Sequence, residues 1–199
     1  MLRRCTHALL LLILTVALGC ASTRIVDTWR DPTFSGSLKR IMVIGVTRQA
    51  GIRRTFEDEL VRELEAKGVR GVASYTLIPE DGEVPKERLA QAVKESGVEG
   101  VLITRLVKVE KRTQVYPATY VGPPYLGFYR YYSWAWVGYY EPPQIYTYDL
   151  VTAETNLFDA ATDKLIWSTT TQTYPNDVKK DIRDFAGVIV KVLADSHLI

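Results

Sequence analysis

The sequence has 199 residues, 47% of them hydrophobic, and a formal net charge of +2. This length fits one domain with a sizeable core. The charge is close to neutral, which argues against nucleic-acid binding because a nucleic-acid site needs a basic surface. His197 is the only histidine beyond residue 19, and Cys5 and Cys20 are the only cysteines. A serine–histidine triad and a zinc–cysteine site are therefore disfavoured.

The first 19 residues have the anatomy of a secretory signal peptide. Arg3 and Arg4 are followed by an apolar run over residues 8–18 that is interrupted only by Thr15. The run is shorter than the ~20 residues that span a bilayer, and a small residue precedes Cys20. Residues 17–20, Ala-Leu-Gly-Cys, resemble a bacterial lipobox, although the usual first leucine is alanine here.

The lipobox resemblance implies cleavage before Cys20 and acylation of its thiol and amine. Several acyl chains give a stable membrane anchor, whereas one is marginal. Ala21 favours the periplasmic face of the outer membrane under the enteric sorting rule. Removal of residues 1–19 leaves bases and acids equal in number, at 23 each. An ordinary cleaved signal peptide and an uncleaved helix are the alternatives.

Residues 20–38 are expected to form a lipidated tether ahead of a single domain at 39–199. Trp29 is too costly to leave in water, so it is expected to dock on the domain. Asp31-Pro32 then imposes an extended or turn geometry. A strand or arm at the sheet edge is the favoured interpretation of this stretch.

The first part of the domain alternates apolar runs with amphipathic stripes. Residues 39–47 predict a buried strand, and Phe56, Leu60 and Leu64 give residues 53–67 a helix stripe. A strand is expected at 69–77, a helix from Pro85 to Gly97, and a strand at 98–111. Gly68 is expected to end the first helix in a left-handed conformation.

The second part predicts an antiparallel hairpin followed by a helix. Residues 146–158 and 165–173 are rich in β-branched residues and flank a turn. The last helix has an apolar stripe and begins at a cap, Asn176 or Asp177. The predicted fold is α/β (α+β): one mixed sheet of about five strands flanked by three helices, in the order βαβαβ, excursion, ββα. Right-handed crossovers are expected to place the first two helices on one face.

Residues 113–145 form an aromatic-rich excursion punctuated by proline and glycine, which disfavours a regular helix or a central strand. Tyrosine and tryptophan offer large contact areas with a hydrogen-bonding tip, so the excursion is the best candidate for binding a partner. Packing against its own domain and contact with the membrane interface are the alternatives. The candidate partner-binding residues are Tyr116, Tyr120, Tyr125, Tyr129, Tyr131, Tyr132, Trp134, Trp136, Tyr139 and Tyr140.

The element order behind a lipobox resembles a group of bacterial envelope lipoproteins. Their domain is similar to the amino-terminal domain of the Tol-system propeller protein, the curli secretion-channel lipoprotein and the activator lipoproteins of penicillin-binding proteins. It also resembles lipoproteins known only as domains of unknown function. The residues that carry the resemblance are 40–46, 56–60 with Gly68, 96–103 and 163–167. It implies a fold and carries no catalytic residue across.

Other candidate chemistry is weak. Asp27 and Asp31 flank Trp29, but turn formation explains an Asp-Pro pair better than a carboxylate site does. Gly45 and Gly51 match neither phosphate-binding motif. The acids 57–59 are expected to form a solvated helix start that complements the dipole rather than a metal site. No catalytic residue, metal or cofactor is expected.

Three hypotheses follow. The leading one is a non-enzymatic envelope scaffold or adaptor that is anchored through Cys20 and binds a protein partner. The second is a subunit of an oligomeric outer-membrane export or pore assembly, which implies self-association. The third is an enzyme acting on the cell wall, which needs two converging carboxylates.

Overall fold

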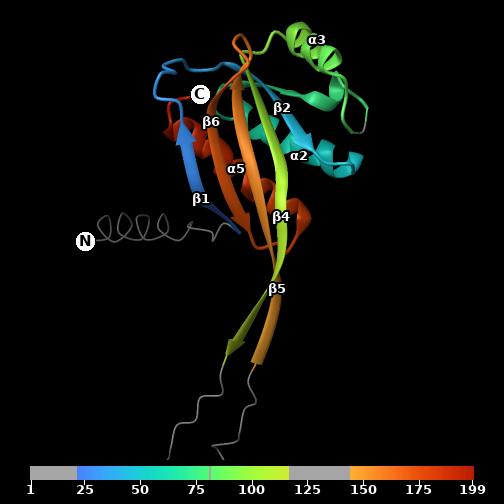
Figure 1. The fold of residues 1–199 in the computed structure, drawn as a ribbon, viewed down its shortest axis with the longest axis vertical. Coiled ribbons are helices and arrows are strands. Elements are labelled where there is room, and N and C mark those ends of the chain that lie inside the picture. The colour runs from blue at the N-terminus through green and yellow to red at the C-terminus, as the bar shows by residue number, and fades with distance from the viewer. Residues whose placement is uncertain (1–21, 81, 117–143) are drawn as a thin grey trace, which may run out of the picture. The chain divides into compact units, whose positions relative to one another are not determined.

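A computed structural model of the protein describes residues 22–80, 82–116 and 144–199. Within these residues, six strands form one sheet accompanied by three α-helices (Figure 1). The elements in chain order are β1 (Thr23–Arg30), β2 (Arg40–Val46), α2 (Ala50–Glu65), β3 (Arg70–Ala73), the 3₁₀ turn η1 (Ser74–Thr76), α3 (Lys86–Ser96), β4 (Gly100–Tyr116), β5 (Gln144–Asp159), β6 (Lys164–Thr173) and α5 (Val178–Asp195). The predicted α+β class is confirmed, with six strands in place of about five.

The chain divides into two compact units. Of the described residues, the core unit comprises 22–80, 82–109 and 151–199, and the hairpin unit comprises 110–116 and 144–150. Strands β4 and β5 contribute residues to both units.

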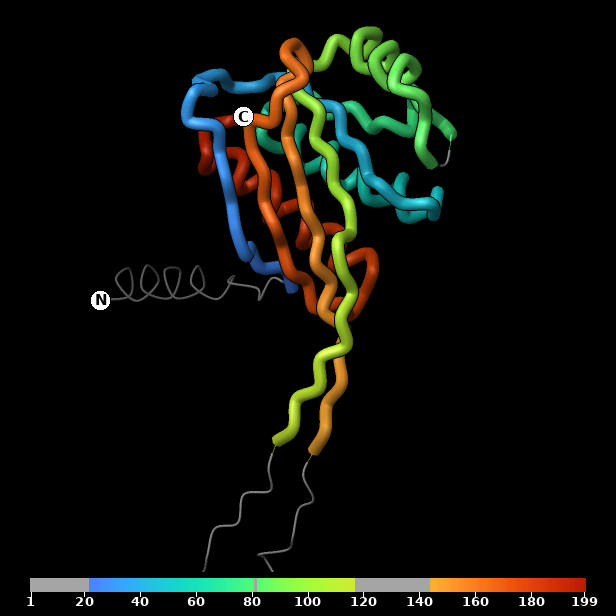
Figure 2. The backbone as a smooth tube through the Cα atoms, viewed as in Figure 1, coloured from blue at the N-terminus to red at the C-terminus, as the bar shows by residue number. Residues whose placement is uncertain are grey.

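The sheet is mixed, with the strand order β1-β6-β5-β4-β2-β3 (Figure 2). Strand β2 is parallel to both of its neighbours, β3 and β4. Strand β6 is antiparallel to β1 and β5. The expected early parallel pairs and late hairpin are therefore confirmed. Strand β2 lies between β4 and β3 and has both of its faces covered, which explains its continuous apolar run.

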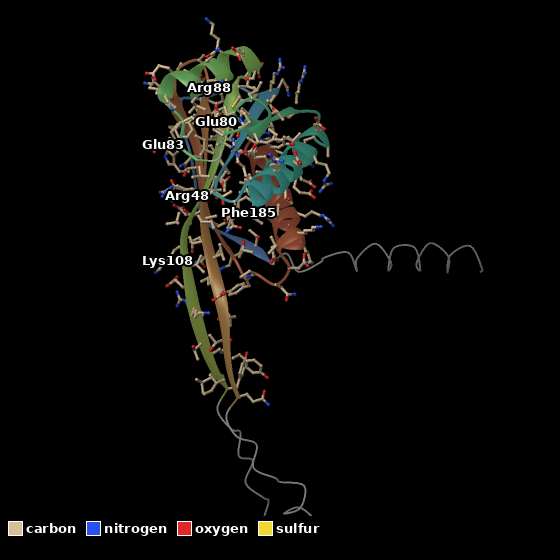
Figure 3. All side chains as sticks on the ribbon, turned by 90° about the vertical axis from the view of Figure 1, so that its right-hand side faces the viewer. Arg48, Glu80, Glu83, Arg88, Lys108 and Phe185 are labelled. Atoms are coloured by element: carbon tan, nitrogen blue, oxygen red, sulfur yellow. The ribbon has the colours of Figure 1, made fainter. Side chains whose placement is uncertain are left out.

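The two faces of the sheet carry separate apolar clusters. Ile41 and Val43 pack on one face with residues of α2 and α5, and Figure 3 shows both helices on that side. Met42 packs on the other face with Ala92 of α3. The expectation that the first two helices share a face is wrong. Since β3 and β4 lie on opposite sides of β2, two crossovers of the same hand place α2 and α3 on opposite faces.

Strand β1 lies within the expected tether and occupies eight of its nineteen residues. It pairs along β6 from Thr23 to Arg30, with a bulge at Val26, which confirms the predicted edge strand. Trp29 does not dock as expected, because its side chain remains 47% exposed. An edge strand has a neighbour on one side only, so its outward side chains have little to pack against.

The helix ends follow the expected chemistry, with one exception. Gly68 and Gly97 adopt positive φ angles of 77° and 60° at the ends of α2 and α3, and the Asp177 side chain caps α5 by accepting from Lys180 N at 2.8 Å. Helix α2, however, begins at Ala50, so its first turn contains no acid. The interpretation of the acids at 57–59 as a dipole-matched helix start is therefore wrong.

Candidate partner-binding surface

The described part of the hairpin unit is a two-stranded antiparallel ribbon made of residues 110–116 of β4 and 144–150 of β5. Side-chain contacts fix which residues face each other across it. Lys111 Nζ donates to Asp149 Oδ1 at 3.3 Å, and the Thr113 and Thr147 hydroxyls lie 3.3 Å apart. Because side chains alternate along a strand, even-numbered and odd-numbered residues here occupy opposite faces.

Beyond the Arg112–Glu110 ion pair, one face of this ribbon carries a cluster of tyrosine and glutamine residues. Its members surround a hollow of about 500 Å³, and they are Gln114, Tyr116, Gln144, Tyr146 and Tyr148. We call these five residues the tyrosine face. Tyr116 and Tyr146 meet edge to face, with ring centroids 5.7 Å apart, and the Tyr146 hydroxyl donates to Gln144 Oε1. The three tyrosines nevertheless remain exposed, at 51%, 53% and 37% in chain order.

The opposite face of the ribbon has a different chemistry. Besides the Lys111–Asp149 and Thr113–Thr147 pairs, it presents Val115 and Ile145, which are 55% and 66% exposed. Aromatic side chains with polar tips are thus concentrated on one side of the ribbon. Exposed tyrosines on a shared face are typical of residues that contribute most to protein–protein binding.

The structure locates one residue of the predicted binding set, and the binding role of the set stays a prediction. Tyr116 lies on the tyrosine face, and the other nine predicted residues lie outside the described residues. At the two ends of the predicted excursion, residues 113–116 belong to β4, and residues 144 and 145 belong to β5. Tyr146, Tyr148 and the two glutamines were missed. The alternation of Gln144, Tyr146 and Tyr148 against Gln114 and Tyr116 was a period-two signal that could have revealed them.

The acids noted in the sequence have structural roles. Glu57 is fully buried and accepts from Arg53 Nε at 3.0 Å, Ser74 Oγ at 2.7 Å and two backbone N–H groups, those of Gly45 at 3.0 Å and Tyr75 at 2.9 Å. Arg53, also buried, donates to Ser74 Oγ and to the carbonyls of Ile78 and Glu80. The buried ion pair thus connects α2 to the ends of β2 and β3.

The Asp-Pro stretch forms the expected turn. Asp31 Oδ1 accepts from the Thr33 hydroxyl at 2.7 Å and from Thr33 N at 2.8 Å. Hydrogen bonding from the Thr33 side chain, followed by that from its backbone, lowers the pKa of Asp31 below its ordinary value. Asp27 accepts from Thr28 N. Among the described residues, no group of three or more His, Cys, Asp or Glu residues is placed to hold a metal ion.

A hollow of about 820 Å³ in the core unit lies between α3 and the β5–β6 turn. Two of the acids that line it bind backbone amides. Glu99 Oε2 accepts from Lys39 N at 2.5 Å, and Asp159 Oδ1 accepts from Ala161 N at 2.8 Å. These carboxylates hold the chain in place and lend no support to a paired-carboxylate site.

The lipidation candidate Cys20 lies outside the described residues, two positions before Ser22. No helix within the described part of the chain has the length and apolar character needed to cross a membrane.

The sequence matches no protein-family model and no curated protein. Solved structures similar to the chain include a PelC dodecamer from Paraburkholderia phytofirmans, with a TM-score of 0.48 and 12% identity over 89% of this chain and 99% of the other. A dodecamer of a PelC variant from the same organism has a TM-score of 0.44 and 13% identity over 86% and 96%. Lipoprotein GNA1162 from Neisseria meningitidis has a TM-score of 0.41 and 11% identity over 79% and 96%.

Proposed function

We propose that the chain is a lipid-anchored protein of the cell envelope that binds a protein partner through the tyrosine face and catalyses no reaction. The observation that carries the proposal is the collection of three exposed tyrosines and two glutamines on one side of the ribbon. The signal peptide and lipobox support envelope location, on the periplasmic face of the outer membrane, and acylation at Cys20.

A bound partner would also stabilise the hairpin unit. An isolated two-stranded ribbon is marginally stable in water and needs further contacts for independent stability. Tyrosine suits such contacts because it buries a large area and keeps a polar tip, at a modest loss of side-chain freedom. The predicted aromatic residues between Tyr120 and Tyr140 would extend the same kind of surface along the chain.

The test compares two double variants in pull-downs from envelope membranes, with the full lipidated protein as bait. Tyr146→Thr with Tyr148→Thr removes two rings from the tyrosine face while retaining strand-forming residues. Val115→Thr with Ile145→Thr makes an equivalent change on the other face. We expect the first variant to lose the partner and the second to retain it. Equal capture by both would contradict the proposal.

A third bait tests the predicted residues outside the described part of the chain. Residues 117–143 are replaced by Asn-Gly, which favours a tight hairpin turn between β4 and β5. Loss of capture in this variant alone would assign binding to the replaced residues rather than to the tyrosine face.

Self-association is the second candidate function, and the open edge of β1 favours it. In the described sheet β1 pairs only with β6, and Ile25, Val26 and Trp29 are 41%, 53% and 47% exposed. Such an edge can add a strand from another chain. An assembly subunit would form a stable oligomer in detergent, visible by native mass spectrometry, whereas an adaptor would be monomeric without its partner.

A further inference from the structure

An apolar groove opens in the core unit where α2 and α5 begin. It has a volume of about 300 Å³, and its lining includes Val46, Ile52, Phe56, Leu106, Val178 and Ile182. Four of these six side chains remain substantially exposed: Val46 55%, Ile52 37%, Leu106 63% and Val178 58%. The floor is closed by Phe185, labelled in Figure 3, whose ring centroid lies 5.5 Å from that of Phe56.

The charged residues that line the groove already have partners. Arg105 pairs with Glu154 at 2.5 Å. Asp181 accepts from Ser22 Oγ at 3.0 Å and from the backbone amides of Asn176 and Asp177. The groove therefore offers apolar surface whose charged neighbours already make hydrogen bonds within the protein, which suits hydrocarbon better than a charged or polar ligand.

Ser22 and Thr23, the described residues nearest to Cys20 in the sequence, form hydrogen bonds beside this groove. Ser22 donates to Asp181, one of the lining residues, and its carbonyl accepts from Tyr174 N at 3.2 Å. Thr23 is buried, and its hydroxyl lies 2.8 Å from that of Thr173, another lining residue. In Figure 1 the starts of β1 and α5 lie at the same end of the core unit, with α3 at the other end.

Two residues of extended chain span at most about 7 Å, so Cys20 is no farther than this from Ser22. The headgroup layer on each side of a bilayer is about 5–7 Å thick. If the Cys20 acyl chains enter the hydrocarbon, as the proposed function requires, Ser22 and the rim of the groove lie within or against the headgroup layer. Exposed apolar side chains are then located where they can contact lipid.

We propose that this groove and its exposed rim are a membrane-docking face that lies on the bilayer into which Cys20 is anchored. The inference rests on the proposed lipid anchor and adds an orientation to it. No long linker separates the core unit from the membrane. The amino ends of α2 and α5 face the lipid, and α3 lies on the side away from it. The same apolar rim would otherwise remain in water next to the membrane.

The test uses single labels on the full lipidated protein. Acylation consumes the Cys20 thiol and Cys5 leaves with the signal, so an introduced cysteine is the only free thiol. Val178→Cys and Val46→Cys place a fluorophore on the rim, and Glu87→Cys places one on α3; all three positions are exposed. Each protein is reconstituted in phosphatidylethanolamine–phosphatidylglycerol vesicles that carry a nitroxide on the acyl chains.

We expect labels at positions 178 and 46 to lose most of their fluorescence to the lipid nitroxide, and the label at 87 to keep nearly all of it. Flotation with the vesicles but equal signals at all three positions would overturn the docking face and leave the anchor intact. Failure to float would overturn the anchor and the face together. Quenching by iodide in the aqueous phase measures whether the label at position 178 is exposed to water. A label that is protected from iodide but not quenched by the lipid nitroxide would also overturn the proposal. It would indicate that a second copy of the chain or an acyl chain of Cys20 fills the groove.

Discussion

Replacing Glu57 by glutamine should be among the most damaging conservative changes in the core unit. The carboxylate is fully buried and accepts from Arg53, Ser74 and two backbone amides at 2.7–3.0 Å. Glutamine has nearly the same shape, but it has one acceptor oxygen and presents an amide N–H₂ where the second oxygen was. At least one donor then faces another donor, and the buried Arg53 charge loses its counter-ion.

The expected cost follows from this geometry. Removing one partner of a buried ion pair typically costs about 3–5 kcal/mol, because the remaining charge stays desolvated. In a chain of this size, each kcal/mol shifts the melting temperature by about 2–4 °C. The Glu57→Gln protein should therefore melt about 6–20 °C below the unmodified chain.

Thermal and urea unfolding of the chain from residue 21 would measure the effect, with Asp58→Asn as the matched control. Asp58 is the next residue, is exposed, and accepts from the Tyr75 hydroxyl at 2.7 Å, a bond that asparagine can retain. The control should stay within about 0.5 kcal/mol. In a double-mutant cycle with Arg53→Met, the combined loss should be smaller than the sum of the single losses. A loss below about 1 kcal/mol for Glu57→Gln would refute the account of this network.

Further predictions concern packing, capping and pH. Gly71→Ala should destabilise the protein by about 1–3 kcal/mol, because the new Cβ would lie 2.8 Å from Val61 Cα. A new Cβ at Gly187 in α5 would meet nothing within 4 Å, so Gly187→Ala should stabilise the protein by up to about 1 kcal/mol. Both changes are measured in the same thermal melts. Asp177→Ala removes the α5 cap and should cost about 1 kcal/mol by urea unfolding. The pKa of Glu154 is lowered from 4.5 by hydrogen bonding from Asn156 and then from Arg105. The ionised Glu154 therefore contributes to the free energy of unfolding above about pH 4.5, and this contribution is lost as the pH falls through the lower pKa of the folded state. The stability of the Glu154→Gln protein should accordingly fall less steeply with decreasing pH.

The elements of the core unit were largely visible in the sequence because their apolar periodicity is strong. The buried run of β2, the stripe of α5 and the β5–β6 hairpin all match their predictions. Glycine chemistry also placed the ends of α2 and α3 at Gly68 and Gly97. These signals are local, since each depends on residues within one or two turns or within one strand.

The errors arose where long-range pairing decides the outcome. The faces of α2 and α3 depend on β2 lying between β3 and β4, which no local pattern encodes. The burial of Glu57 depends on Arg53 in the preceding turn and on Ser74, which lies beyond the next strand. The tyrosine face needs two strands in register, and its β4 half was assigned to the excursion because prolines follow closely after Tyr116.

The position of β1 limits how far the core unit could lie from a membrane in which Cys20 is anchored. A free tether over residues 20–38 could extend about 60 Å, which would let the domain search a wide volume above the membrane. In the structure Ser22 already donates to Asp181 and Thr23 is buried and paired with Thr173, so Cys20 can lie no more than about 7 Å from Ser22. With Cys20 acylated, the core unit must stay at the membrane surface, and any partner that contacts this unit must approach that surface as well.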